Sequence, residues 1–232
     1  MILESRIDDV RREFLDRTTR GHGTLLHEVE QYATQRLGKM LRPRMLLAAA
    51  DTLGEADSQR TLMLAVCVEM IHNASLIHDD IIDHADTRRG QDSVNHRWSN
   101  AVAVLVGDYL LAQTTLLINE VGDPTASKLL NQTMLQMVES ELLQQEILGH
   151  RPMTRDDYLT IIDGKTARLF ATAAALGNPA YEEYGLHYGR LFQLRDDLAD
   201  NEDTPFTQSL IKEEEAALKE TLDKNKLQPL VL

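Results

Sequence analysis

Acidic and basic side chains gather in one short stretch of the chain, at the end of an apolar segment. Asp79 and Asp83 are four residues apart, so a helix places both carboxylates on one face, where like charges repel each other. A cation offsets that repulsion, and oxygen ligands alone favour a hard ion such as Mg²⁺. Arg88 and Arg89 follow, and the planar guanidinium fork suits phosphate oxygens. The stretch therefore predicts a site that holds a phosphate group with Mg²⁺ and arginine.

The spacing Asp-Asp-x-x-Asp occurs twice in the chain, each time on an apolar helical background. The two copies comprise six carboxylates: Asp79, Asp80 and Asp83, then Asp196, Asp197 and Asp200. Asp accounts for 20 of the 232 residues, so chance alone gives roughly 0.15 matches to this pattern. Helices that face each other across a bundle can bring two such clusters into one cavity. A solvated acidic helix end is the alternative for either copy alone.

Further cations and a histidine lie near these motifs or on apolar helical segments. Lys39 and Arg42, in the segment Lys-Met-Leu-Arg-Pro, form either a second anion site or a plain exposed basic turn. His72 lies two turns before Asp79 on the same face, as an anion contact or as a hydrogen-bonded core histidine. Lys165 lies on an apolar segment, from which it reaches either a ligand or the solvent.

Composition narrows the functional classes. The net charge of −13 argues against nucleic acid as a partner, since its phosphates need a basic surface, but a phosphorylated small molecule meets only its local site. The single cysteine, Cys67, cannot form an internal disulfide, so we expect a buried, inert thiol in a reducing compartment. The N-terminus is acidic and amphipathic and no apolar run approaches about 18 residues, so we expect no signal peptide, no membrane span and a cytoplasmic location.

Helical periodicity is present between nearly all Gly and Pro positions, and no alternating strand pattern is convincing. Ser58 is the expected cap of the helix that carries the first acidic motif, and Thr154 with Asp157 forms a box-like start for another. No linker divides the chain, so we expect one all-α domain over residues 1–232. The expected helices span residues 2–18, 25–37, 45–53, 58–86, 100–121, 125–148, 154–176, 180–202 and 207–226.

Five segments, in order along residues 25–203, resemble those of the trans-isoprenyl diphosphate synthases, also called the polyprenyl synthetase family. Members make farnesyl, geranylgeranyl and longer prenyl diphosphates. Leu37 replaces a glycine of the family pattern, and Asp92 replaces a common proline. In chain order, the five segments are Leu37–Pro43, the acidic motif with Arg-Arg-Gly at Asp79–Gly90, Gly107–Leu111, Gly164–Ala167 and the second acidic motif at Phe192–Asp200.

The resemblance implies an isoprenoid-synthase-type helical bundle around a deep central cavity, usually as a homodimer. It implies head-to-tail condensation of isopentenyl diphosphate with an allylic prenyl diphosphate through an allylic cation, and the six motif carboxylates match the family's Mg²⁺ positions. Arg88 and Lys165 match contacts to the allylic diphosphate. Thr166 and Gln193 match positions that stabilise the cation. The isopentenyl diphosphate site is matched by Lys39, Arg42, His72 and Arg89.

Product length is expected to depend on Ala74 and Ser75, just before Asp79. Both are small where short-chain family members often have an aromatic floor, so we expect a product of geranylgeranyl length or longer. The chain is short at its C-terminal end relative to the family, which usually continues with a Gly-Lys loop and further helices. Three functions therefore remain: an active prenyl chain elongator, a non-catalytic partner subunit of a heteromeric synthase, and a terpene cyclase of the same architecture.

Overall fold

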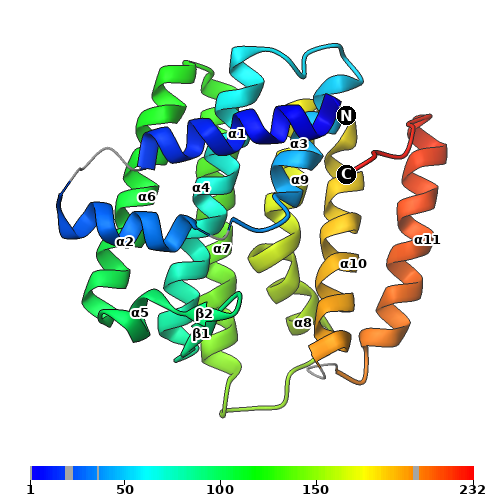
Figure 1. The fold of residues 1–232 in the computed structure, drawn as a ribbon. Coiled ribbons are helices and arrows are strands. Elements are labelled where there is room, and N and C mark those ends of the chain that lie inside the picture. The colour runs from blue at the N-terminus through cyan, green and yellow to red at the C-terminus, as the bar shows by residue number, and fades with distance from the viewer. Residues whose placement is uncertain (1, 19–22, 36, 201–203) are drawn as a thin grey trace. The chain divides into compact units, whose positions relative to one another are not determined.

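The structure, a computed structural model, describes residues 2–18, 23–35, 37–200 and 204–232 (Figure 1). Helices dominate it, so the all-α prediction is confirmed. Contacts divide the chain into two compact units. Unit 1 comprises Met1–Arg44 and Asp57–Asp123, and unit 2 comprises Met45–Ala56 and Pro124–Leu232. The single domain over residues 1–232 stays a prediction, and the two units are described one at a time.

Unit 1 is built on two long helices, α4 (Gln59–Ile82) and α6 (Asn100–Val121), which pack side by side (Figure 1). Ser58 caps α4 as predicted, because its hydroxyl accepts the backbone N–H of Thr61. The other elements of unit 1 are α1 (Ile2–Thr18), α2 (Leu25–Thr34), the start of α3 (Leu41–Asp51), β1 (Thr87–Arg88), β2 (Gln91–Asp92) and α5 (Val94–Arg97).

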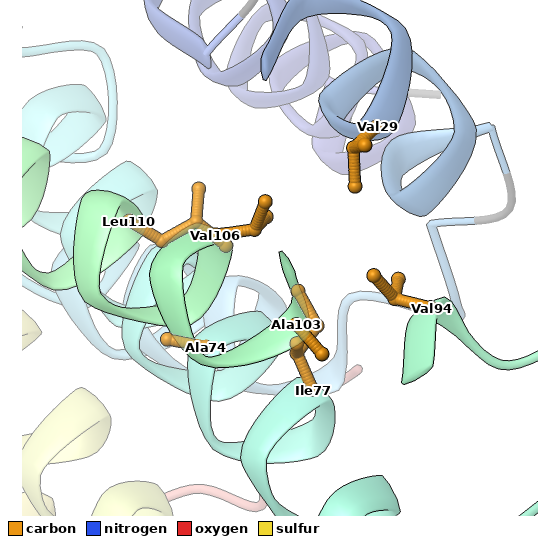
Figure 2. Close-up of a cluster of buried hydrophobic side chains, with 7 residues drawn as sticks. All are labelled: Val29, Ala74, Ile77, Val94, Ala103, Val106 and Leu110. Carbon is orange, nitrogen blue, oxygen red and sulfur yellow. The ribbon is translucent and has the colours of Figure 1, made fainter. Parts of the chain in front are cut away.

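The core of unit 1 contains a cluster of hydrophobic side chains from α2, α4, α5 and α6, shown in Figure 2. Ala74 and Ala103 are completely buried in it. Removing such side chains from water stabilises the fold by about 25 cal/mol per Å² of apolar area. The seven residues of the cluster are Val29, Ala74, Ile77, Val94, Ala103, Val106 and Leu110.

Both α4 and α6 are long and apolar enough to cross a bilayer. The expectation that no segment meets this requirement was therefore wrong for these two helices. In the most apolar 18-residue window of each helix, 67% is buried in α4 and 39% in α6. A core helix of a globular unit passes the same test of length and composition. Cys67 lies within α4, which confirms the expectation of a buried thiol, and burial raises its pKa to about 12. A thiol with so high a pKa forms little of the reactive thiolate at neutral pH.

Unit 2 continues from α3 into a second set of helices. Thr154 and Asp157 form the predicted capping box at the start of α8. A second buried cluster joins α8, α10 and α11 through Tyr158, Leu194 and Leu210. The elements are α7 (Pro124–Ile147), α8 (Arg155–Ile162), a π-helical turn (Asp163–Ala167), α9 (Arg168–Gly177), a 3₁₀ turn (Pro179–Tyr181), α10 (Glu182–Asp200) and α11 (Thr207–Asn225).

Two expected helices differ from the observed ones near the predicted site. The helix carrying the first acidic motif ends at Ile82 with Asp83 as its C-cap, so it does not continue to residue 86 as predicted. The helix predicted over 154–176 is interrupted by the five-residue π-helical turn, which we call the π-turn. The β1–β2 hairpin was not predicted, because strands of two residues are too short to show an alternating pattern.

Glu30 on α2 is a buried carboxyl group, and neither of its oxygens has a hydrogen-bond partner among the described residues. Burial raises its pKa from 4.5 to about 7. Because the pKa of Glu30 is higher in the folded state than in the unfolded state, the folded protein is most stable below the unfolded-state pKa. That contribution to the free energy of unfolding is lost as the pH rises to 7. We expect Glu30→Gln to be more stable than the original chain at pH 8 by roughly 1–3 kcal/mol. Thermal unfolding at pH 8 and pH 5 measures this, and equal midpoints at pH 8 would contradict it.

Candidate functional site

The first acidic motif lies at the C-terminal end of α4. Asp79 is half-buried and Asp83 is exposed, and the backbone N–H of Asp83 donates to the carbonyl of Asp79 at 2.8 Å. A helix C-terminus carries partial negative charge, which adds to the repulsion between the two carboxylates. In the described part of the chain no three His, Cys, Asp or Glu side chains lie close enough to hold a metal ion together. The motif therefore offers a pair of carboxylates that suits a cation with other ligands of its own.

Asp80, the middle carboxylate of the motif, points into the protein. Its side chain is only 4% exposed, and its Oδ1 accepts Arg88 Nε at 2.8 Å and also Arg88 Nη2. Burial raises the pKa of Asp80, and the hydrogen bond from Arg88 opposes that rise. Asp80 thus anchors Arg88 on the β1–β2 hairpin.

Arg42 and His72 form a half-buried contact in unit 1. Arg42 Nη1 lies 3.2 Å from His72 Nε2. Burial, reinforced by the charges of Arg42 and Arg89, lowers the pKa of His72 well below its usual value, so the ring is neutral and its Nε2 accepts from Arg42. Burial also lowers the pKa of Arg42 to about 10, which still leaves a cation at neutral pH. The predicted basic site therefore includes a buried arginine.

Glu69, one turn before Asn73 on α4, is the buried countercharge of this basic site. It is 1% exposed, and its Oε1 accepts Asn73 Nδ2 at 2.9 Å. Burial raises its pKa, while the positive charge of Arg42 lowers it. Sequence reasoning missed Glu69, although an acid inside the run Cys-Val-Glu-Met-Ile is a signal, since glutamate is rarely buried unless it is paired.

The segment with Lys39 is a fixed loop, and two non-glycine residues near it adopt left-handed backbone conformations. Met40 has φ 52° and Arg89 has φ 51°, and such strained residues concentrate at functional sites. A Cβ atom on Gly38 would lie 2.8 Å from Arg89 Nη2, so the glycine leaves room for that guanidinium beside the loop. The carbonyl of Lys39 accepts Arg44 Nε at 2.9 Å. These contacts favour an organised anion site over a plain basic turn.

The second acidic motif lies on the last turns of α10 in unit 2 and repeats the arrangement of the first. Asp196 and Asp200 are exposed and one turn apart, whereas Asp197 is buried. Asp197 Oδ1 accepts Gln193 Nε2 at 2.6 Å, and its Oδ2 accepts the hydroxyl of Tyr158. The middle carboxylate is again held by donors of the chain, and the outer two face the solvent.

The chain of hydrogen bonds that runs from Thr166 through Gln193 to Asp197 has a fixed direction. A carboxylate only accepts, so the amide nitrogen of Gln193 must face Asp197 and its Oε1 must face Thr166. Thr166 Oγ1 lies 2.6 Å from that oxygen and therefore donates its proton to it. The lone pairs of the threonine oxygen then point away from Gln193, where they can stabilise a positive charge.

Lys165 is half-buried and paired, which excludes the alternative of a lysine that simply extends to solvent. Its Nζ lies 2.7 Å from Glu141 Oε2 and 3.5 Å from Gln144 Oε1 on α7. Lys165 and Thr166 both belong to the π-turn, and π-helical turns occur frequently at functional sites. Sequence reasoning missed Glu141 and Tyr158, because each meets its partner across more than 20 residues of chain and no local pattern marks them.

The structure brings the predicted residues together in two groups. Unit 1 holds the first acidic motif and the basic site, and unit 2 holds the second motif with the residues of the π-turn. Ser75 is half-buried, donates to the carbonyl of His72 at 2.9 Å, and shares the helix face of Asp79, four residues on. Ala74 instead lies in the core cluster (Figure 2). Residues 201–203, after the second motif, lie outside the described residues.

Comparison with known proteins identifies relatives over most of the chain. The family model for polyprenyl synthetase matches residues 23–212. An all-trans-nonaprenyl-diphosphate synthase (geranyl-diphosphate specific) of Rhodobacter capsulatus is 36% identical over 197 residues, covering 81% of this chain and 61% of that protein. Heptaprenyl diphosphate synthase component 2 of Bacillus subtilis is 33% identical and covers 85% of this chain and 59% of that protein. The chain thus spans about three fifths of the length of these curated relatives.

A solved structure is similar over nearly the whole chain. It is a polyprenyl synthase from Caulobacter crescentus complexed with calcium and isoprenyl diphosphate, with a TM-score of 0.78 and 28% sequence identity. The match covers 97% of this chain and 86% of the other.

Proposed function

The chain belongs to the polyprenyl synthetase family, and we propose on that basis that it is a Mg²⁺-dependent trans-prenyltransferase. It condenses isopentenyl diphosphate head to tail with an allylic prenyl diphosphate, through an allylic cation, to an all-trans polyprenyl diphosphate. One observation carries the proposal. In each Asp-Asp-x-x-Asp motif the two outer carboxylates are accessible, and the middle carboxylate is buried and accepts hydrogen bonds from other side chains of the protein.

The carboxylates divide into two roles. The outer members of the motifs hold Mg²⁺, while Asp80 and Asp197 hold Arg88 and Gln193 in place. Mg²⁺ usually keeps several waters and binds through one or two carboxylates plus substrate phosphates, so a pair of outer carboxylates in each motif fits it. When bound, Mg²⁺ supplies Lewis-acid stabilisation of the departing diphosphate. The proposed ligands are Asp79, Asp83, Asp196 and Asp200.

The cations of the chain hold the two diphosphates. Arg88, fixed by Asp80, and Lys165, fixed by Glu141, contact the allylic diphosphate. A buried arginine with a neutral histidine beside it is a strong anion site, because low local polarity strengthens charge-assisted hydrogen bonds. This second site takes isopentenyl diphosphate and comprises Lys39, Arg42, His72 and Arg89.

The reaction needs no nucleophile from the protein. The allylic C–O bond breaks with its electron pair leaving on the diphosphate, and Thr166 Oγ1 directs its lone pairs at the resulting cation while Gln193 holds that oxygen in place. The double bond of isopentenyl diphosphate then forms the new C–C bond. Loss of a proton to the released diphosphate restores the double bond and completes the step.

Product length follows the residue on the Asp79 face of α4. We propose a product of geranylgeranyl length or longer, because Ser75 is small. Ser75→Phe should shift products to shorter chains, measured by chromatography of the dephosphorylated prenols. Ala74→Phe places a ring in the completely buried core cluster, so it should instead cost about 1–3 kcal/mol of stability. An unchanged product from folded Ser75→Phe would contradict this assignment.

A second copy of the chain is the proposed partner. On α6, Leu105 and Leu116 share one face and are 68% and 58% exposed, and on α7 Leu135, Val138 and Leu142 form another exposed apolar stripe. Exposed stripes of this kind mark interaction surfaces. We therefore propose a homodimer, located in the cytoplasm, and light scattering of the purified protein measures its mass.

The second candidate is a partner subunit of a heteromeric synthase, because a close relative is named heptaprenyl diphosphate synthase component 2. Calorimetry with Mg²⁺ and a bisphosphonate, a non-hydrolysable diphosphate analogue, separates the two candidates. A catalytic chain binds the bisphosphonate with Mg²⁺ and loses that binding in EDTA. A non-catalytic subunit binds neither, and that result would overturn the proposed function.

A further inference from the structure

Arg190 on α10 joins three elements of unit 2 at the start of the π-turn. Its Nε and Nη2 donate to the two oxygens of Asp163 at 2.5 and 2.6 Å. Its Nη1 donates to Glu214 Oε1 on α11 at 3.2 Å. Glu214 is 5% exposed, and His187 Nδ1 lies 2.5 Å from its other oxygen. Each of the three guanidinium nitrogens therefore donates either to the π-turn or to α11. Helix α11 packs along α10 (Figure 1).

The Asp163–Arg190 contact is accompanied by a second polar contact between the π-turn and the same stretch of α10. This second contact is the hydrogen bond from Thr166 to Gln193, three residues further along both segments. The backbones also touch there, since a Cβ on Gly189 would lie 2.5 Å from the Cα of Ala167. A rotation or a shift of the π-turn against α10 thus displaces both polar contacts together.

A π-turn needs such support from outside. It is less favourable than an α-helical turn, and the structure around it must hold it in place. Conversion to α-helix removes one residue from the turn, so side chains rotate progressively along it, by up to about 100° at its end. Thr166 would then no longer meet Gln193, and its lone pairs would leave the position from which they stabilise a cation.

We propose that Arg190 is a positioning residue for prenyl transfer. By holding Asp163 it keeps the π-turn in register with α10, so that Thr166 meets Gln193, and by holding Glu214 it makes this register depend on α11. The inference rests on the proposed function. Arg190 contacts no substrate in this arrangement, so its loss should lower kcat and leave KM for isopentenyl diphosphate nearly unchanged. KM for the allylic diphosphate should rise, because Lys165 lies on the same π-turn.

The test compares Arg190→Met with a matched control, Arg155→Met. Arg155 also forms an ion pair with α11, through Glu213 at 2.5 Å, but it is exposed and lies on α8 outside the π-turn. Arg190→Met should lower kcat by about tenfold or more, since small misplacements of catalytic groups are costly, and Arg155→Met should leave it unchanged. Arg190→Lys, which keeps the charge but not the fork, should recover part of the loss.

A double variant shows whether Arg190 acts through the π-turn. In the background Thr166→Val, Arg190→Met should produce little further loss of kcat, because the contact that it positions is already absent. An equal loss in both backgrounds would overturn the proposal, as would a kcat within twofold of the original chain for folded Arg190→Met.

Hydrogen exchange of the backbone amides at 164–168 gives a readout that is independent of turnover. Arg190→Met should speed this exchange more than tenfold, and Arg155→Met should not. If the original chain has no turnover but exchange responds as expected, the proposed function fails while the positioning of the π-turn stands. Unchanged exchange in Arg190→Met would overturn the positioning itself.

Discussion

Replacing Asp79 with asparagine should lower kcat/KM for prenyl transfer by about 10³-fold or more, because it removes a proposed Mg²⁺ ligand where the departing diphosphate needs charge stabilisation. The half-saturating Mg²⁺ concentration should rise at the same time. Asp79 suits this test because it is half-buried on the surface of α4, so the isosteric change leaves the core intact. Turnover measured across a Mg²⁺ titration gives both quantities.

Asp80→Asn is the matched control within the same motif. Asp80 is buried on Arg88, so its loss should cost about 1–3 kcal/mol of stability and raise KM for the allylic substrate. Its half-saturating Mg²⁺ concentration should stay within about twofold of the original value. Identical Mg²⁺ dependence in the Asp79 and Asp80 variants would contradict the division of roles between outer and middle carboxylates.

Arg42→Met should be the most destabilising single change in the proposed isopentenyl diphosphate site, at about 3–5 kcal/mol. Glu69 is 1% exposed, and its Oε2 has no hydrogen-bond partner among the described residues. The charge of Arg42 is the largest influence that lowers the pKa of Glu69 against burial, so without Arg42 that pKa rises further. Stability is then present at low pH and lost as the pH rises, so chemical unfolding should show a larger cost at pH 8 than at pH 5.

The double variant Arg42→Met with Glu69→Met separates stability from binding. Removing both members of a buried pair is often neutral, so the double variant should regain most of the lost stability. It should keep the raised KM for isopentenyl diphosphate, since the phosphate contact stays absent. A double variant that recovered both stability and KM would show that Arg42 acts only as a partner for Glu69.

Local patterns predicted the parts of the site that depend on spacing. The Asp-Asp-x-x-Asp repeats, the Ser58 cap and the Thr154 capping box follow from side-chain preferences within a few residues. The distinction between outer and middle carboxylates did not follow, because it depends on Arg88 and on Tyr158, which lies 39 residues from Asp197.

The remaining features were missed for the same physical reason. No local pattern marks the π-turn, and its ion pair with α10 joins Asp163 to Arg190, 27 residues away. Glu141 pairs with Lys165 across unit 2. Ala74 and Ser75 are adjacent in the sequence, yet one is in the core and the other on the Asp79 face, and only the packing of α6 against α4 decides which.

A turnover assay decides whether the chain is a Mg²⁺-dependent prenyltransferase. Purified protein is mixed with labelled isopentenyl diphosphate and with geranyl, farnesyl or geranylgeranyl diphosphate, in Mg²⁺ or in EDTA. We expect labelled prenyl diphosphates of geranylgeranyl length or longer with Mg²⁺ and none with EDTA. Folded protein that yields no product from any primer with Mg²⁺, or the same product in EDTA, would contradict this expectation.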